Sequence, residues 1–352
     1  MASFKDLHFT PAEFTNTAKV NKHLFSELES DGLIRTVRKR IGNVDRKMVT
    51  LEDMQNYFRI LRANPDVFSP VSTDAAPASA QAAEDATSQP VAAATRFIPQ
   101  PPKNKIQMLY NVKGGTGKST LAAQYAMRAS MLGLNVLAID LDGQGHLTVN
   151  LDILDAHERP TIYDVLINDL PIANAVMNVA PGLDLIPANL GLCNIEIPLN
   201  NKPRREYRLS EAIKKIAHNY DLIIADTNPA ASILNSSMLV ATNLVNVVCA
   251  TNPLSFHGMS LVMATIEGME REFGHELQVK IIPNMYDNRE VISQEVLGEL
   301  RSQFSEFCTK AVVNRSADLN EATKRRTSVW DVSTKGVAAQ DINSLTEELI
   351  RN

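Results

Sequence analysis

A glycine-rich segment in the first half of the chain constrains the fold more than any other feature. Residues 113–120 read Lys-Gly-Gly-Thr-Gly-Lys-Ser-Thr, after the apolar run 106–112 and before the alanine-rich, helix-favouring run 121–131. A strand, a glycine-rich loop and a helix in this order form a phosphate-binding site. The loop's backbone N–H groups converge on phosphate oxygens, and the helix N-terminus adds partial positive charge. The segment therefore predicts an α/β nucleotide-binding fold.

The residues of this loop have distinct expected roles. Lys118 is placed to reach the β- and γ-phosphates, and the hydroxyl of Ser119 is placed to bind Mg²⁺. Lys113 opens the loop at a position where ordinary loops of this class need no charge. The other residues expected to line the nucleotide are Gly114, Gly115, Thr116, Gly117 and Thr120.

Two further motifs place carboxylates just beyond the ends of apolar runs. Asp140 and Asp142 follow the loop by one helix and one strand, and Asp142 is placed to orient or deprotonate a water that attacks the γ-phosphate. Asp226 ends the apolar run 222–226, where it is expected to hold Mg²⁺ through water. An isolated Asp pair can simply cap a helix, and many buried strands end in Asp. The order of the three motifs favours the nucleotide site.

Apolar runs alternate with helical stretches after residue 103, which is typical of a doubly wound, mainly parallel sheet. Most of these runs are uninterrupted, as in strands that are covered on both faces. The first run enters the glycine-rich loop, so the ligand belongs at the carboxyl ends of the strands. The expected strands are 106–111, 136–140, 183–187, 222–226, 244–251 and 279–284.

Length and composition indicate more than one domain. The chain has 352 residues, long for a single domain. Residues 65–102 are rich in Ala, Pro, Ser, Thr and Gln, and we expect a flexible linker there, with a partly helical segment as the alternative. The linker separates a small domain, residues 1–64, from a larger one, residues 103–352.

Residues 1–64 have the pattern of a small, mostly α, winged helix-turn-helix domain. Thr10 and Glu13 form a capping box, a second helix is expected to stop at 31–32, and Thr50 caps a final amphipathic helix. Eleven Lys and Arg against eight Asp and Glu make this part basic within a chain of net charge −5. The domain is expected to bind DNA; a helical adaptor with solvated basic residues is the alternative. The candidate DNA contacts are Arg35, Arg38, Lys39 and Arg40.

Composition and cysteine usage exclude several classes of protein. Hydrophobic residues make up 44% and charged residues 21%, an ordinary globular composition. Cys193, Cys249 and Cys308 are too far apart for a zinc, redox or iron–sulfur motif, which favours a reduced compartment. The N-terminus lacks the apolar core of a signal peptide, and no apolar run approaches the roughly 20 residues that span a bilayer. We expect a cytoplasmic protein.

The motifs together resemble one family. The loop 113–120 is similar to the deviant Walker A motif of the ParA/MinD ATPases, 140–148 to their second motif, and Asp226 to their Walker B aspartate. With the N-terminal domain, which resembles the winged helix-turn-helix of MerR-type regulators, the chain is similar to the larger ParA proteins that segregate plasmids or chromosomes. Further similar stretches are 161–166, 185–189, 284–287 and 319–322.

The resemblance implies a P-loop ATPase that uses ATP and Mg²⁺. Lys113 would cross to the phosphates of a partner subunit, while Lys118 would bind phosphate in its own. Asp142 would activate the water, and Ser119 with Asp226 would place Mg²⁺. ATP would then drive homodimerisation, the dimer would bind nonspecific DNA, and a ParB-like centromere-binding protein would stimulate hydrolysis. A nucleoid-associated location follows.

The resemblance also marks further binding residues and three departures. Asn284 falls in a stretch implied to bind the cofactor. The family usually has Pro at the position of Gly143, often Asn at His146 and commonly Pro at Asn228, so the departures bear on hydrolysis more than on ATP binding. A solvated helix end is the alternative for the basic cluster placed where ParA dimers are expected to meet DNA, which comprises Arg315, Lys324, Arg325 and Arg326.

Three functions share this catalytic core. The first is a DNA partition ATPase that also binds specific operator DNA through residues 1–64, and it is the one we expect. The second is a positioning ATPase for a protein cargo such as a chemoreceptor array. The third, a MinD-like membrane-associated division regulator, requires a basic amphipathic C-terminal helix, whereas residues 341–350 are acidic. We therefore expect no membrane partner.

Overall fold

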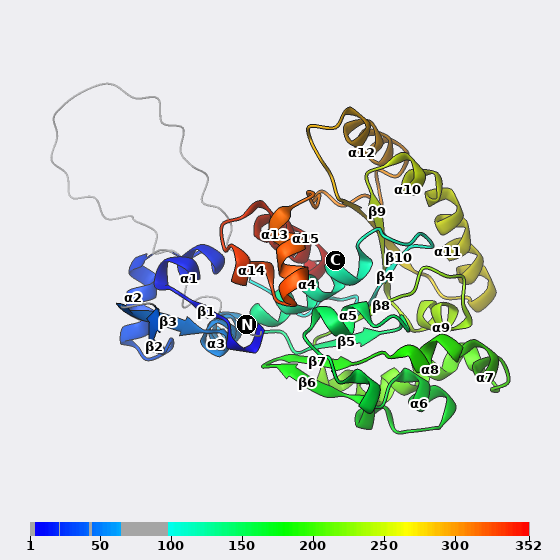
Figure 1. Ribbon diagram of the computed structural model, residues 1–352, viewed down its shortest axis with the longest axis horizontal. Helices are drawn as coiled ribbons and strands as arrows, with labels where there is room; N and C mark the ends of the chain where they lie inside the picture. Colours follow the sequence, from blue (N-terminus) through cyan, green and yellow to red (C-terminus); the bar gives the residue numbers. More distant parts are fainter. Residues whose placement is uncertain (1–3, 21, 42–43, 65–97, 352) are drawn as a thin grey trace.

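The computed structural model describes residues 4–20, 22–41, 44–64 and 98–351, arranged as a large α/β body with a smaller N-terminal region against one side (Figure 1). Most of the expected linker, residues 65–97, lies outside the described residues.

The body is built on a seven-stranded sheet in the order β10-β9-β4-β8-β5-β7-β6. All neighbouring strands are parallel except β6 and β7. The six expected strands are confirmed, with ends that differ by one residue at most. β6 was not expected, because this edge strand is short and only partly buried. The strands are β4 (Ile106–Tyr110), β5 (Val136–Asp140), β6 (Met177–Ala180), β7 (Leu183–Ile186), β8 (Leu222–Asp226), β9 (Leu244–Ala250) and β10 (Gln278–Asn284).

Helices cover both faces of this sheet (Figure 1). Along β5, Val136 and Ala138 join one apolar core, while Leu137 and Ile139 join the other. This alternation explains why the strand is apolar at every position. On the first face lie α4 (Lys118–Met131), α14 (Val329–Val332) and α15 (Val337–Arg351). On the second face lie α6 (Ile162–Ile167), α8 (Arg205–Ile216), α9 (Ile233–Ala241), α11 (Met259–Phe273) and α12 (Val291–Gln303). The remaining helices of the body are α5 (His146–Asn150), α7 (Glu196–Asn200), α10 (Pro253–His257) and α13 (Ala317–Arg325).

The N-terminal region contains three helices and a small antiparallel sheet in the order β1-β3-β2. Thr10 and Glu13 form the expected capping box, and the Thr50 side chain accepts from the backbone N–H of Asp53 at the start of the last helix. The elements are α1 (Pro11–Thr17), α2 (Lys22–Ser30), α3 (Leu51–Ala63), β1 (His8–Phe9), β2 (Thr36–Ile41) and β3 (Val44–Thr50).

The N-terminal region shares its apolar core with the body. Phe14 and Tyr57 belong to the same cluster of buried side chains as Tyr125 of α4. Arg128, only 1% exposed, donates a hydrogen bond to the carbonyl oxygen of Thr17 at 3.2 Å and lies over the ring of Trp330. The N-terminal region and the body therefore pack around one apolar core, to which α3 contributes, and the expected division into domains on either side of residues 65–102 stays a prediction.

Polar contacts fix α3 against the amino ends of the strands. Gln55 donates to the carbonyl oxygen of Pro181 at 2.7 Å, just before β7, and Arg62 donates to that of Pro99 at 2.8 Å. Gly133, with φ +77°, lies before β5, and a β-carbon there would be 2.7 Å from the carbonyl oxygen of Gln55. The backbone of α3 thus approaches the body too closely for any other residue at this position.

Candidate nucleotide-binding site

The glycine-rich loop connects the carboxyl end of β4 to the first turn of α4. Gly117, with φ +90°, precedes the helix and makes no side-chain cap, so the first N–H groups of α4 stay available for an anion. A β-carbon at Gly117 would overlap the amide nitrogen of Asn284. Glycine is therefore required here both for the left-handed backbone and for the approach of β10.

The two lysines of the loop lie in different surroundings. Lys118 is only 6% exposed, and its ammonium group donates to the carbonyl oxygen of Lys113 at 3.2 Å. Burial lowers the pKa of Lys118, while the nearby carboxylates of Asp226 and Asp142 raise it. Lys118 is thus a buried cation at the end of the loop, where the N–H groups of α4 also point.

Lys113 is half-buried, and among the described residues it forms no ion pair. Its ammonium group donates to Oδ1 of Asn252 at 3.2 Å, and its backbone N–H donates to Oδ1 of Asn111 at 2.9 Å. Asn252 caps α10 with the same oxygen, which accepts from the N–H of Ser255. The Lys113 ammonium group therefore contacts a neutral amide at the rim of the loop, and no carboxylate of the described residues pairs with it.

Asp226 is the group that fits a magnesium ion. Both of its carboxylate oxygens are buried without a hydrogen bond of ordinary geometry from the described residues, although the Ser119 hydroxyl lies close enough to lower its pKa. Burial is the larger effect and, with the charge of Asp140, it raises the pKa of Asp226 well above the usual value. An unpaired buried carboxylate beside a hydroxyl has the oxygen ligands that Mg²⁺ prefers.

The carboxylates of Asp140 and Asp142 have different surroundings: Asp140 is buried and holds a helix, and Asp142 is half-buried. Oδ2 of Asp140 accepts from the N–H and the hydroxyl of Thr148, at 2.8 and 2.7 Å, so Asp140 holds α5, as the capping alternative predicts. Burial raises the pKa of Asp140 to about 6. Asp142 is half-buried, and its Oδ1 accepts from the N–H of Gln144 at 3.0 Å. Asp142 is therefore the member of the pair that is open to a bound molecule.

Asn284 ends β10 beneath the loop. Its side-chain amide donates to the carbonyl oxygen of Thr116 at 2.7 Å, and its own oxygen is buried without a partner among the described residues. It thus supports the loop from below. Asn284 was predicted as a binding residue, but this contact with the loop was not predicted. Asn111 and Asn252 were not predicted, although Asn111 directly follows a strand and Asn252 begins a helix.

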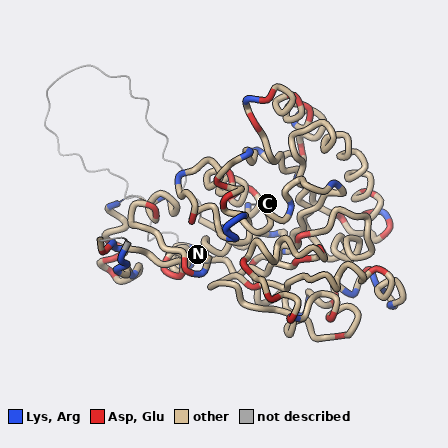
Figure 2. Tube along the Cα trace, in the orientation of Figure 1, with Lys and Arg blue, Asp and Glu red and all other residues tan. Residues whose placement is uncertain are grey.

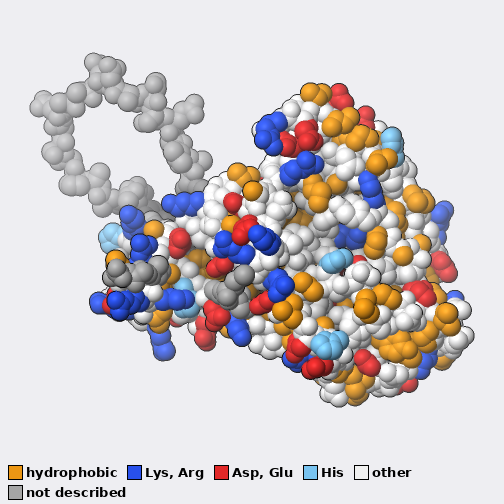
Figure 3. Space-filling model, in the orientation of Figure 1, with side chains coloured by type: hydrophobic (Ala, Val, Ile, Leu, Met, Phe, Trp, Pro, Cys, Tyr) orange, Lys and Arg blue, Asp and Glu red, His pale blue; other side chains and the backbone are white. Residues whose placement is uncertain are grey.

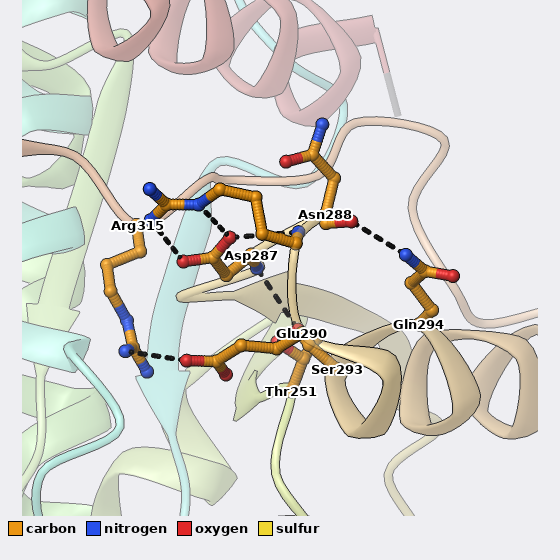
Figure 4. Close-up of polar contacts among 8 residues, drawn as sticks. Thr251, Asp287, Asn288, Glu290, Ser293, Gln294 and Arg315 are labelled. Atoms are coloured by element: carbon orange, nitrogen blue, oxygen red, sulfur yellow. Dashed lines mark hydrogen bonds and ion pairs between the residues drawn. The ribbon is translucent and has the colours of Figure 1, made fainter.

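The chain after Asn284 turns through a polar cluster (Figure 4). Arg289 pairs with Asp287 at 2.7 Å and holds the pKa of that carboxyl below its usual range. The N–H of Asp287 donates to the hydroxyl of Ser293, which also bonds to the hydroxyl of Thr251 at 2.7 Å. Arg315 pairs with Glu290 at 3.3 Å. This cluster fixes the loop that follows β10 to the start of α12.

The loop that carries Asp142 lies directly against Cys193. A β-carbon at Gly143 would be 2.8 Å from the backbone nitrogen of Cys193 and would overlap its sulfur. Real β-carbons do not approach backbone atoms this closely, so a side chain at position 143 requires one of the two segments to move. The close contact with Cys193 therefore leaves no room for the Pro that the family usually has at this position.

Comparisons with known proteins agree with this geometry. A family profile described as an AAA domain matches residues 104–279. The cell division protein PomZ of Myxococcus xanthus is 33% identical over 248 residues, which cover 69% of this chain and 77% of that protein. The chromosome partitioning protein ParA of Caulobacter vibrioides is 31% identical over 250 residues, which cover 70% and 94%.

The chain belongs to the ParA/MinD family of ATPases. The resemblance found in its motifs is thereby confirmed, and the family to which it belongs contains ParA-type partitioning ATPases.

Solved structures confirm the P-loop NTPase fold of this ParA/MinD family member. An ATP complex of McdA from Cyanothece superposes with a TM-score of 0.65 at 18% identity and covers 71% of this chain and 97% of that one. Cobyrinic acid a,c-diamide synthase from Mycobacterium smegmatis, with a bound ATP analogue and magnesium, gives a TM-score of 0.55 at 26% identity and covers 63% and 93%. Among the described residues, no helix has the length and hydrophobicity needed to cross a membrane.

Proposed function

We propose that the protein is a nucleotide-switched DNA partition ATPase, which dimerises when it binds ATP and Mg²⁺. The observation that carries the proposal is the pair of lysines in one loop. Lys118 is buried beside Asp226, and Lys113 lies at the rim with no carboxylate partner among the described residues. One lysine suffices to bind phosphate within a subunit. The second is explained by a nucleotide bound to the other subunit of a homodimer.

The cofactors are ATP and Mg²⁺. Lys118 and the N–H groups at the start of α4 hold the phosphates, and the other residues of 114–120 line them. Ser119 and Asp226 would hold Mg²⁺, which when bound offsets the charge of the phosphates. Asn284 keeps Thr116 and Gly117 in place, so its effect on the nucleotide is through the loop.

Hydrolysis is assigned to Asp142. Its carboxylate orients the attacking water and accepts a proton as the new bond from oxygen to the γ-phosphorus forms and the bond to the ADP oxygen breaks. Lys113 of the partner subunit faces the same phosphates and stabilises the charge that develops on them. ADP and phosphate then no longer join the subunits, and the dimer separates.

The dimer is proposed to bind nonspecific DNA near the nucleoid, with a ParB-like protein that stimulates turnover. Curated relatives include both chromosome partitioning proteins and a cell division protein, so a protein cargo is the second candidate. Specific operator DNA as a further partner remains a prediction, as do the DNA contacts expected at Arg315 and at residues 324–326.

The test is light scattering of the full chain with ATP and Mg²⁺, with ADP, and without nucleotide. We expect a doubled mass only in the sample with ATP and Mg²⁺. A mass that is the same in all three conditions would contradict the proposed switch. A pull-down with the Asp142→Ala variant under ATP would then separate the two cargoes: a centromere-binding protein indicates partition, and a protein assembly without DNA indicates positioning.

A further inference from the structure

The hairpin of the N-terminal region carries a dense group of positive charges. We call its residues 35–41 and 44–47 the wing. Lys and Arg gather around the wing at one end of the molecule (Figures 2 and 3). Asp45 is the one carboxylate that accompanies the six cations of this segment, which are Arg35, Arg38, Lys39, Arg40, Arg46 and Lys47.

In two successive pairs the register of the wing places like charges directly opposite one another, whereas the third pair, Arg40 with Asp45, joins opposite charges. Arg38 of β2 pairs with Lys47 of β3, and the next pair is Lys39 with Arg46. Opposed like charges destabilise an antiparallel pair. Residues 38–40 and 44–47 are also exposed at every position, so the ribbon presents both of its faces to solvent. An anionic partner with a regular spacing of charges would remove this repulsion.

Within the described part of the chain, most of these cations form no ion pair, although Asp45 lies opposite Arg40 in the ladder. Lys47 pairs with Glu29, and Lys39 contacts Nδ1 of His8 at 3.4 Å. Among the described residues, no ion pair is formed by Arg38, Arg40 or Arg46. The side chains of these three arginines are therefore available to an external anion.

The basic cluster near the C-terminus is different, because each of its cations already has a carboxylate partner. Arg325 pairs with Glu321 at 2.8 Å, and Lys324 lies 4.0 Å from the same carboxylate. Arg326 lies 3.9 Å from Asp152. Arg315 pairs with Glu290, as Figure 4 shows. Of the two candidate DNA surfaces, the wing is the one with uncompensated charge.

In the expected helix-turn-helix, α2 is the second helix and would be the recognition helix, but its residues are poorly suited to contact bases. Its exposed His23 and Glu27 pair with each other at 3.3 Å. Glu29 accepts from the hydroxyl of Thr36 at 2.8 Å and pairs with Lys47, which lowers the pKa of Glu29. Glu29 thus braces the wing, and α2 as a whole carries one Lys against two Glu. A net acidic helix is repelled by the phosphates that border a groove.

We propose that the wing is the principal DNA contact of this protein and that it binds the phosphate backbone of duplex DNA without reading sequence. The inference builds on the proposed function and makes the N-terminal region a nonspecific anchor in place of an operator reader. A two-stranded ribbon fits a DNA groove, and arginines without base partners contact phosphates irrespective of sequence. The expected operator would then not be recognised by this region.

The position of the wing is compatible with this assignment. α3 binds the loops before β5 and β7, which are amino ends of strands, whereas the nucleotide loop follows the carboxyl end of β4. DNA on the wing and a partner subunit on the nucleotide edge therefore use opposite edges of the sheet. Since the N-terminal region shares its apolar core with the body, the wing and the nucleotide edge keep a fixed position relative to each other.

The experiment compares two variants that each remove two positive charges from the full chain. Arg38→Gln with Arg40→Gln alters the wing, and Arg325→Gln with Arg326→Gln alters the C-terminal cluster, which is the competing candidate surface for DNA. Binding to two 40-base-pair duplexes of unrelated random sequence is measured by fluorescence anisotropy with ATP and Mg²⁺ at several salt concentrations. Thermal melts confirm that both variants are folded.

We expect the wing variant to bind both duplexes roughly 10- to 50-fold more weakly near physiological salt, with a salt slope reduced by about two, as for two lost phosphate contacts. The C-terminal variant should lose affinity by a smaller factor than the wing variant. A loss in the C-terminal variant that is as large as in the wing variant, or larger, would overturn the proposal. So would a loss confined to one duplex, or a strong effect of Lys22→Ala with His23→Ala on α2.

Light scattering of the same samples separates this proposal from the proposed function. If the wild type dimerises with ATP and the wing variant binds DNA as the wild type does, only the proposal for the wing is contradicted. A wild-type chain that fails to dimerise with ATP contradicts the switch, whatever the DNA measurement shows.

Discussion

The ammonium group of Lys118 donates a hydrogen bond to the backbone carbonyl oxygen of Lys113 at 3.2 Å, so the last lysine of the loop closes on the first. The contact keeps Lys118 inside the loop while the Lys113 side chain points to Asn252 at the rim. The two lysines are five residues apart and face different environments. Substitutions at these two positions should therefore have separable effects.

Lys118→Ala is expected to remove ATP binding. The charge of the buried ammonium group acts on Asp226 and lowers the pKa of that carboxyl, and each charged hydrogen bond lost to the phosphates costs roughly 1.5–3 kcal/mol. Equilibrium binding of a fluorescent ATP analogue measures the effect. Lys214→Ala, an exposed lysine on α8, is the control and should bind normally. An affinity in Lys118→Ala close to that of the wild type would contradict its phosphate role.

Lys113→Ala should bind the ATP analogue with nearly unchanged affinity but fail to form the ATP-dependent dimer. The side chain contacts Asn252 in its own subunit, so its removal leaves the phosphate cradle intact. Light scattering with ATP checks the dimer. If the variant dimerises as the wild type does, Lys113 does not act across the subunit interface.

Asp142→Ala should lower turnover roughly 100- to 10 000-fold, the range for loss of a general base, while the dimer persists. Asp140 cannot replace it, because Oδ2 of Asp140 is held by Thr148. Phosphate release in single-turnover assays measures the rate. Asp155→Ala, on the surface beside Arg159, serves as the control. Normal turnover in Asp142→Ala would exclude Asp142 from the reaction.

Asp226→Asn should stabilise the free protein by about 1–2 kcal/mol at neutral pH, as active-site substitutions that relieve strain commonly do, and should abolish magnesium-dependent ATP binding. Burial raises the pKa of Asp226 in the folded state above that of the unfolded chain. The folded state therefore holds the proton more tightly, and ionising the group costs stability as the pH rises.

The advantage of the asparagine variant should accordingly be absent below about pH 4, where the carboxyl is protonated in both states, and grow as the pH rises from there. Chemical denaturation without nucleotide at several pH values measures it. Addition of ATP and Mg²⁺ should stabilise the wild type alone. An advantage that shrinks with rising pH would show that the buried carboxylate is not the cause.

Gly143→Ala should reduce turnover more than ATP affinity. The new β-carbon would meet the backbone nitrogen of Cys193 at 2.8 Å, so the segment that carries Asp142 must shift, while Lys118 is not involved. Gly268→Ala in α11 is the matched control, because a β-carbon there meets no atom within 4 Å and should add about 1 kcal/mol of helix stability. Equal kcat values for Gly143→Ala and the wild type would show that the loop absorbs the side chain.

Much of the fold could be predicted because its signals are local. The six apolar runs became strands of the sheet, and Thr10 and Thr50 cap the helices that their positions indicated. The glycine-rich loop depends on neighbouring residues in the chain, so its conformation follows from residues 113–120 and the elements on either side. β6 was missed because it has only four residues, which are only partly buried, so its sequence is less apolar than that of its partner β7.

What only the tertiary structure decided concerns contacts between residues far apart in sequence. Asn284 lies 168 positions from the loop residue that it supports, and Cys193 meets Gly143 across the sheet edge. Charge counts marked both the wing and the C-terminal cluster as basic. In the C-terminal cluster Glu321 of the same helix pairs with Lys324 and Arg325, whereas the partners of Arg315 and Arg326, Glu290 and Asp152, are far away in sequence and are brought there by the fold. The sequence by itself determined the glycine-rich loop with the strand and helix that flank it, because they form one continuous segment. The packing of the N-terminal region and the surroundings of its arginines depended on surfaces that only folding brings together.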